Sequence, residues 1–154
     1  MPGFFEKYEK VISGVVGVLT FCSVFIAAWQ LRQASKQIEA STIYQIQKDG
    51  RQLLGSLNQD SSIFNYIYKY KDGTKYNQDV VSRAERKIVE LTQYFSSVFN
   101  QRRNGIISDP YWTTFNEEIC HFFRIKPVTR FWEERGKSGQ YSDDFKTLIR
   151  SCLN

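Results

Sequence analysis

Histidine, cysteine and proline are scarce in this chain of 154 residues, which has one histidine, three cysteines and three prolines. A single histidine excludes a histidine-rich metal site and any mechanism that needs two histidines within one subunit. So few cysteines, in odd number, do not suggest a disulfide scaffold. We therefore expect Cys120 and Cys152 to be buried, inert thiols, and we expect no metal site and no cofactor.

Charged residues are missing from Val11 to Leu31. As a helix, this run would span about 30 Å, the thickness of the hydrocarbon core of a bilayer. Trp29 lies near one end, where an interfacial aromatic is common. A cleaved signal peptide is the alternative, but the run is long for its apolar core. We predict an N-terminal tail and transmembrane helix over residues 1–31 and a cytosolic helical domain over residues 32–154.

Positive charges on the two sides of the apolar run bear on its orientation. The N-terminal side offers Lys7, Lys10 and the α-amino group, whereas the C-terminal side offers Arg32, Lys36, Lys48 and Arg51. Positive charge is enriched on the cytoplasmic side of membrane helices. The absence of an Asn-x-Ser/Thr sequon agrees with that side. We expect a single-pass protein of the cell membrane whose C-terminal domain is cytoplasmic.

The predicted membrane helix has two unlike faces. Small and hydroxyl-bearing residues lie on one of them, and those we expect to pack against other copies or to line a pore are Ser13, Gly17, Thr20 and Ala27. Such residues let helices approach closely in lipid. The alternative is a plain anchor in which the small residues are incidental.

A polar line extends beyond the apolar run. It consists of residues at heptad spacing, Gln30, Gln37, Tyr44 and Arg51, which share one face of a helix. This line could form a vestibule between subunits, or it could simply be a solvated face. Gly50 predicts a bend or break, because glycine in a helix interior costs about 1 kcal/mol.

The remaining sequence has helical rather than alternating periodicity. It predicts an all-α fold, with one N-terminal transmembrane helix continuing into a cytosolic helical bundle. We expect helices over 63–71, from Asp79 to between 101 and 105, from Ser108-Asp109-Pro110, from Pro127 and from Ser142. The second of these has the clearest amphipathic pattern and should lie at the centre of the core, through Val81, Ala84, Ile88, Leu91, Phe95, Val98 and Phe99.

His121 is the strongest candidate for a catalytic group. With Asn116 it occupies the positions of an Arg-x4-His motif, in which arginine stabilises phosphate charge and histidine moves a proton during RNA cleavage. Asn116 brings no charge, so we do not expect an enzyme. Glu118-x-x-His121 has the spacing of a metal ligand pair, but a helical di-metal site needs a second such pair.

This layout, with its remnant at Asn116 and His121, resembles the membrane-anchored accessory proteins of type VI-B CRISPR antiphage systems. It is also similar to other small single-pass bacterial membrane proteins with a helical, nuclease-like (HEPN-like) cytosolic domain. The resemblance implies a ring-like oligomer or pore that permeabilises the membrane in antiviral defence, alongside an RNA-guided RNase. The partners implied are membrane lipid, further copies of the chain, and that RNase or its RNA products. The sequence identifies no small-molecule substrate.

Two other functions remain open at this point. One is a membrane-tethered module that binds a partner without forming a pore. The other is a degenerate helical-domain ribonuclease that uses His121.

Overall fold

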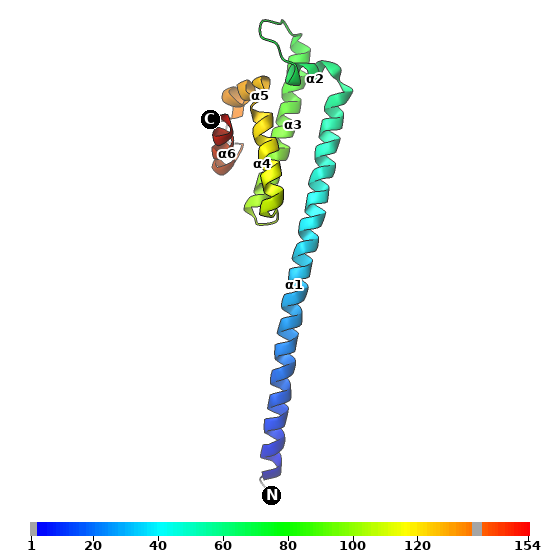
Figure 1. Ribbon diagram of the computed structural model, residues 1–154, viewed down its shortest axis with the longest axis vertical. Helices are drawn as coiled ribbons and strands as arrows, with labels where there is room; N and C mark the ends of the chain where they lie inside the picture. The colour runs from blue at the N-terminus through cyan, green and yellow to red at the C-terminus, as the bar shows by residue number, and fades with distance from the viewer. Residues whose placement is uncertain (1–2, 137–139) are drawn as a thin grey trace. The chain divides into compact units, whose positions relative to one another are not determined.

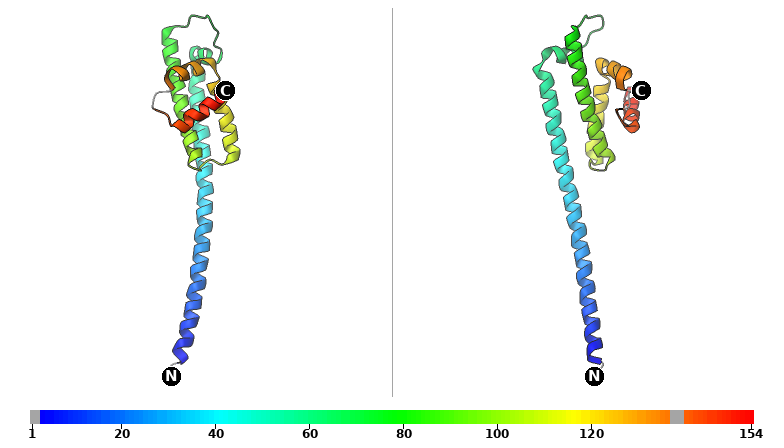
Figure 2. Two further views of the ribbon diagram at one scale, coloured as in Figure 1. Left: turned by 90° about the vertical axis from the view of Figure 1, so that its left-hand side faces the viewer. Right: turned by 180° about the vertical axis from the view of Figure 1, so that it is seen from behind.

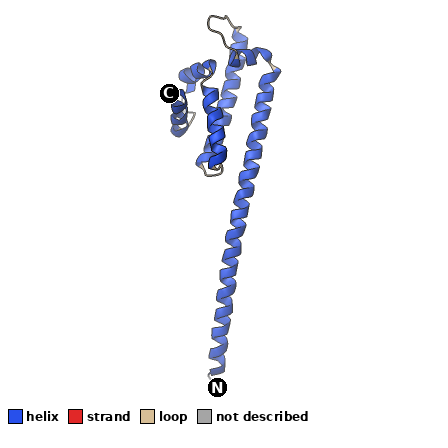
Figure 3. Ribbon diagram, viewed as in Figure 1, coloured by secondary structure: helices blue, strands red, loops and turns tan. Residues whose placement is uncertain are grey.

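The computed structural model describes residues 3–136 and 140–154, with side chains from Val16 onward (Figure 1). All regular structure in this part of the chain is helical, which confirms the predicted all-α fold (Figure 3). The chain forms two compact units that meet between Ala40 and Ser41. The two are described separately below.

The first unit is the N-terminal part of helix α1, which runs from Gly3 to Gln59. Its described apolar side chains are exposed, among them Phe21 at 74% and Leu31 at 72%. Within the described residues, α1 is the one helix long and apolar enough to cross a membrane. A signal sequence near the N-terminus would meet the same criteria of length and hydropathy.

Helix α1 continues through Gly50, so the predicted bend or break is wrong. A tertiary contact explains why a glycine occupies this position inside the helix. A Cβ atom added at Gly50 would lie 2.7 Å from the hydroxyl oxygen of Tyr94, which donates a hydrogen bond to the carbonyl of Ile46 at 3.0 Å. Glycine is therefore explained here by the close approach of another helix.

The second unit comprises Ser41 to the C-terminus and packs the end of α1 against the other helices. These are α2 (Ser61–Tyr68), α3 (Gln78–Arg103), α4 (Asp109–Phe123), α5 (Lys126–Phe131), the π-helical turn η1 (Trp132–Gly136) and α6 (Asp143–Leu153). Helices α3 and α4 run antiparallel, α6 packs against α4, and α2 and α5 lie at one end of α3 (Figure 2).

The core of this unit lies around α3, as predicted. The buried side chains of α3 include five of the seven expected ones, Ala84, Ile88, Leu91, Phe95 and Val98. Phe123 and Phe145, from α4 and α6, are fully buried against the same core. Burying a side chain of this size stabilises a fold by about 1.5–3 kcal/mol. A smaller cluster of Ile46, Val98, Ile107 and Phe115 fixes α1 to α3 and α4.

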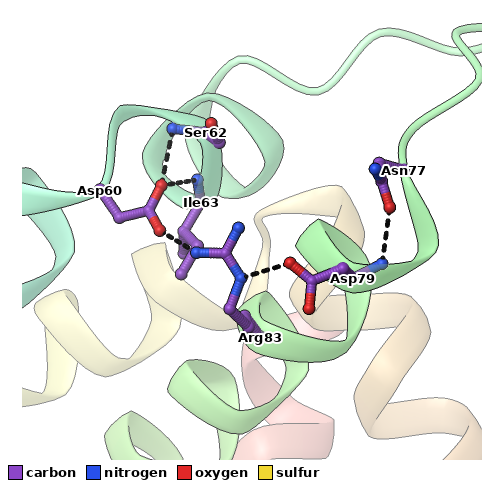
Figure 4. Close-up of polar contacts among 6 residues, drawn as sticks. All are labelled: Asp60, Ser62, Ile63, Asn77, Asp79 and Arg83. Atoms are coloured by element: carbon purple, nitrogen blue, oxygen red, sulfur yellow. Dashed lines mark hydrogen bonds and ion pairs between the residues drawn. The ribbon is translucent and has the colours of Figure 1, made fainter.

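A polar corner joins α1, α2 and α3 (Figure 4). Asp60 caps α2 by accepting hydrogen bonds from the backbone N–H groups of Ser62 and Ile63, and it also pairs with Arg83 on α3. Arg83 in turn pairs with Asp79 at 2.9 Å. The sequence predicts that α3 starts at Asp79, but Asn77 caps the helix and Asp79 lies in its first turn.

The other helix ends follow the sequence closely. Ser108 precedes α4 with a proline in its first turn, a proline also opens α5, and Ser142 caps α6 by accepting a hydrogen bond from the N–H of Phe145. Helix α2 ends at Tyr68, before the predicted 71. Beyond it, Tyr70 stacks on Tyr76.

Cys120 and Cys152 form a disulfide, which corrects the expectation of unpaired thiols. Cys120 lies on α4 and Cys152 on α6, and the packing of these two helices brings their Cα atoms to 4.8 Å. This separation suits a disulfide. Cys22, on α1, is free and exposed.

Candidate assembly surface on helix α1

The predicted packing stripe is uncovered on the single chain. A Cβ atom built at Gly17 meets nothing within 4 Å, and Thr20 and Ala27 are exposed. The side chain of Ser13 lies outside the described residues. A face made of such small residues leaves room for a second helix to approach closely.

The hydroxyl groups of this segment are satisfied within α1. Thr20 donates from Oγ1 to the carbonyl of Val16 at 2.8 Å, and Ser23 donates from Oγ to the carbonyl of Leu19 at 2.8 Å. Lipid offers no competing hydrogen bonds, so a polar side chain must find its partner in protein. These two side chains are therefore compatible with a hydrocarbon environment.

The residues of the predicted polar line are exposed. Gln30, Gln37, Tyr44 and Arg51 are all exposed, Tyr44 at 63%. In the packed part of α1, the buried residues are Ile43, Ile46 and Leu57. Tyr44 and Arg51 therefore point away from the face of α1 that joins the core.

A hollow of about 270 Å³ lies where the apolar run gives way to charged residues. It is lined by Trp29, Arg32, Gln33 and Lys36. An aromatic ring with two cations just beyond an apolar helix is the pattern found at membrane interfaces. These side chains therefore mark the end of the segment that could lie in lipid.

Asn116 and His121 do not converge. At 100° per residue they differ by about 140° around α4. His121 is exposed and lines an apolar groove of about 380 Å³ with Glu117 and Glu118. Asn116 is half-buried, and its Oδ1 has no hydrogen-bond partner among the described residues. Within one subunit, the pair gives no shared site for a phosphate.

The described residues contain no group of three or more His, Cys, Asp or Glu side chains that could hold a metal ion. Glu118 and His121 border the same groove, but no third ligand of this kind accompanies them in the described part of the chain.

A cavity of about 590 Å³ between α2 and α5 was not predicted. Tyr66, Tyr70, Arg124, Lys126 and Arg130 are among its lining residues. Burial, followed by the nearby Tyr70 and Glu85, raises the pKa of Tyr66. The spacings Tyr66-x-x-x-Tyr70 and Lys126-x-x-x-Arg130 were the available signals, but the sequence does not reveal that the two segments meet.

No family model, no curated protein and no solved structure matches this chain.

Proposed function

We propose that the chain is a membrane-anchored oligomeric effector, in which α1 assembles several copies into a ring or pore. By permeabilising the membrane, this assembly would act in antiphage defence alongside an RNA-guided RNase. The observation that carries the proposal is the exposure of the polar line of Gln30, Gln37, Tyr44 and Arg51 on an unbroken helix. The identity of the system rests on the resemblance described above.

The physical argument begins with the two surfaces of α1. The stripe at Gly17, Thr20 and Ala27 lets copies pack closely in lipid. Ala27 and Gln30 are three residues apart and so are neighbours on the helix surface. The polar line therefore begins where the packing stripe ends. In a closed ring, a repeated polar line would surround a shared water-filled space.

We also propose that residues 32–154 face the cytoplasm, because more positive charge follows the apolar run than precedes it. The Cys120–Cys152 disulfide bears on this point in the opposite direction, since disulfides are rare in reducing compartments. A cytoplasmic location would require the disulfide to be reduced, so the redox state of this pair tests the orientation.

Conduction is tested by charge substitution in the polar line. The full chain is reconstituted into planar bilayers, and the reversal potential is measured in a salt gradient for Gln37→Glu and Gln37→Lys. If Gln37 lines a water-filled path, the two variants shift the reversal potential in opposite directions, so each serves as the control for the other. Equal potentials would contradict the placement of Gln37 in the conducting path, and no conductance in the unmodified protein would contradict pore formation.

Assembly is tested at Gly17. Gly17→Leu fills the space needed for close packing, so we expect a smaller oligomer in detergent. Gly55→Leu is the matched control, because Gly55 is also on α1 with nothing within 4 Å of an added Cβ, but outside the apolar run. If both variants keep the same oligomer size, Gly17 does not lie in the packing surface.

A further inference from the structure

The cavity between α2 and α5 combines aromatic rings and cationic side chains with two carboxylates, Asp72 and Glu133. Tyr66 on α2 and Tyr70 just beyond it form part of the wall, and Arg124, Lys126 and Arg130 line the same space. Its volume of about 590 Å³ is within the range of small-molecule sites. All these residues belong to one compact unit.

Arg124 is held in place by the backbone. Its Nε donates to the carbonyl of Cys152 at 2.8 Å, in a contact that is partly buried. This bond orients the guanidinium and occupies only one of its five N–H donors. Among the described residues, no hydrogen bond of its terminal nitrogens is found, so they can donate to an anion, and a planar fork of this kind suits a phosphate.

Two further cations are held by weak pairs. Lys126 pairs with Asp72, and Arg130 pairs with Glu134 at 3.3 Å. All four side chains are well exposed, between 59% and 70%. Exposed pairs contribute little to stability, so a phosphate can replace either carboxylate at small cost.

The aromatic wall is a packed cluster of three rings. Tyr70 stacks on Tyr76 with ring centroids 5.4 Å apart, and Tyr66 meets both rings edge-on, at 5.7 and 5.0 Å. A second hollow, of about 290 Å³, shares Tyr66 and Tyr70 and is bordered by Glu85 and Glu134. Its carboxylates can accept hydrogen bonds from amino or hydroxyl groups.

We propose that this site binds a free nucleotide. Arg124 and Lys126 hold the phosphate, and the base lies against Tyr66 and Tyr70. The combination of a fixed arginine, an exchangeable lysine and an aromatic wall selects a ligand that has both a phosphate and a flat ring. The site lies within one compact unit of a single chain and does not require association through α1. Nucleotide binding can therefore be tested whether or not the copies assemble.

The test is equilibrium binding of the fluorescent nucleotide mant-ADP to the detergent-solubilised full chain. We expect saturable binding that ADP reverses, with inorganic phosphate and adenosine each at least about tenfold weaker as competitors. Absence of saturable binding would overturn the proposal. Competition by phosphate equal to that by ADP would also overturn it, because the rings would then take no part.

Variants assign the two halves of the site. Lys126→Gln and Tyr70→Leu should each weaken mant-ADP binding about tenfold, because one removes a phosphate contact and the other an aromatic contact. Both variants should fold, since neither side chain is fully buried. Arg103→Gln is the matched control, because it removes an exposed cation paired with Asp144 that does not line the cavity. Equal binding by all three variants would place the nucleotide elsewhere.

Discussion

At the scale of single residues, Gly50 shows how packing can override helix propensity. In an open helix position, replacing glycine by alanine stabilises by about 1 kcal/mol. At Gly50 the new methyl group would lie 2.7 Å from the hydroxyl of Tyr94 and displace it from the carbonyl of Ile46. The lost hydrogen bond is worth about 0.5–1.5 kcal/mol.

We therefore predict that Gly50→Ala gives no stabilisation or a net loss. The matched change Gly55→Ala, where an added Cβ meets nothing within 4 Å, should stabilise by about 1 kcal/mol. Chemical unfolding of the full chain in detergent measures the change in the free energy of unfolding for both variants. A gain at Gly50 as large as that at Gly55 would show that Tyr94 does not hold this position in solution.

Tyr94 also predicts a loss of stability in alkali. Burial, with smaller contributions from Glu118 and Asp49, raises its pKa from 10.0 to about 12. The unfolded chain loses this proton first as pH rises, so the stabilisation is complete below pH 10.0 and disappears as pH approaches about 12. The melting temperature of the full chain should fall over this interval, and less steeply in Tyr94→Phe. Identical slopes in the two proteins would contradict this assignment.

At the scale of elements, the corner at Asp60 has two functions, capping α2 and pairing with Arg83 on α3. The backbone N–H of Ile63, and then Arg83 and the N–H of Ser62, lower the pKa of Asp60 below 3.8. The contribution of the Asp60 carboxylate to the free energy of unfolding is therefore present above pH 3.8. It is lost as the pH falls through the lower pKa of the folded state.

Two substitutions separate the functions of Asp60. Asp60→Asn keeps an acceptor for the cap but loses the charge, whereas Asp60→Ala loses both, so we expect Ala to lower the melting temperature more than Asn. Glu90→Ala, which removes a surface pair with Lys87 and no cap, is the control and should have the smallest effect. Equal melting temperatures for the two Asp60 variants would show that the cap contributes nothing.

Local signals predicted the elements well, because helix ends are determined by neighbouring residues. The starts of three helices were predicted in this way, from Ser142 and from the prolines that follow Ser108 and Lys126. Features that depend on distant segments were missed. These are the contact of Gly50 with Tyr94, the pairing of Cys120 with Cys152, and the cavity between α2 and α5.

At the scale of the whole molecule, the orientation can be determined from the cysteines. If residues 32–154 face the cytoplasm, Cys120 and Cys152 should be reduced. When the cells are quenched with acid and the protein is alkylated in denaturant without a reductant, all three cysteines should then be modified. Mass spectrometry counts the modified sites. Modification of Cys22 alone would mean that the disulfide persists, and it would place the domain on the oxidising side of the membrane.

The central claim is that α1 assembles copies of the chain into a ring. The most direct test is the mass of the detergent-solubilised protein by light scattering, corrected for bound detergent. A ring that encloses a water-filled path requires several subunits, so we predict a single species of about six or more copies. A monomer or dimer would contradict the claim and favour a membrane-tethered module that binds a partner without forming a pore.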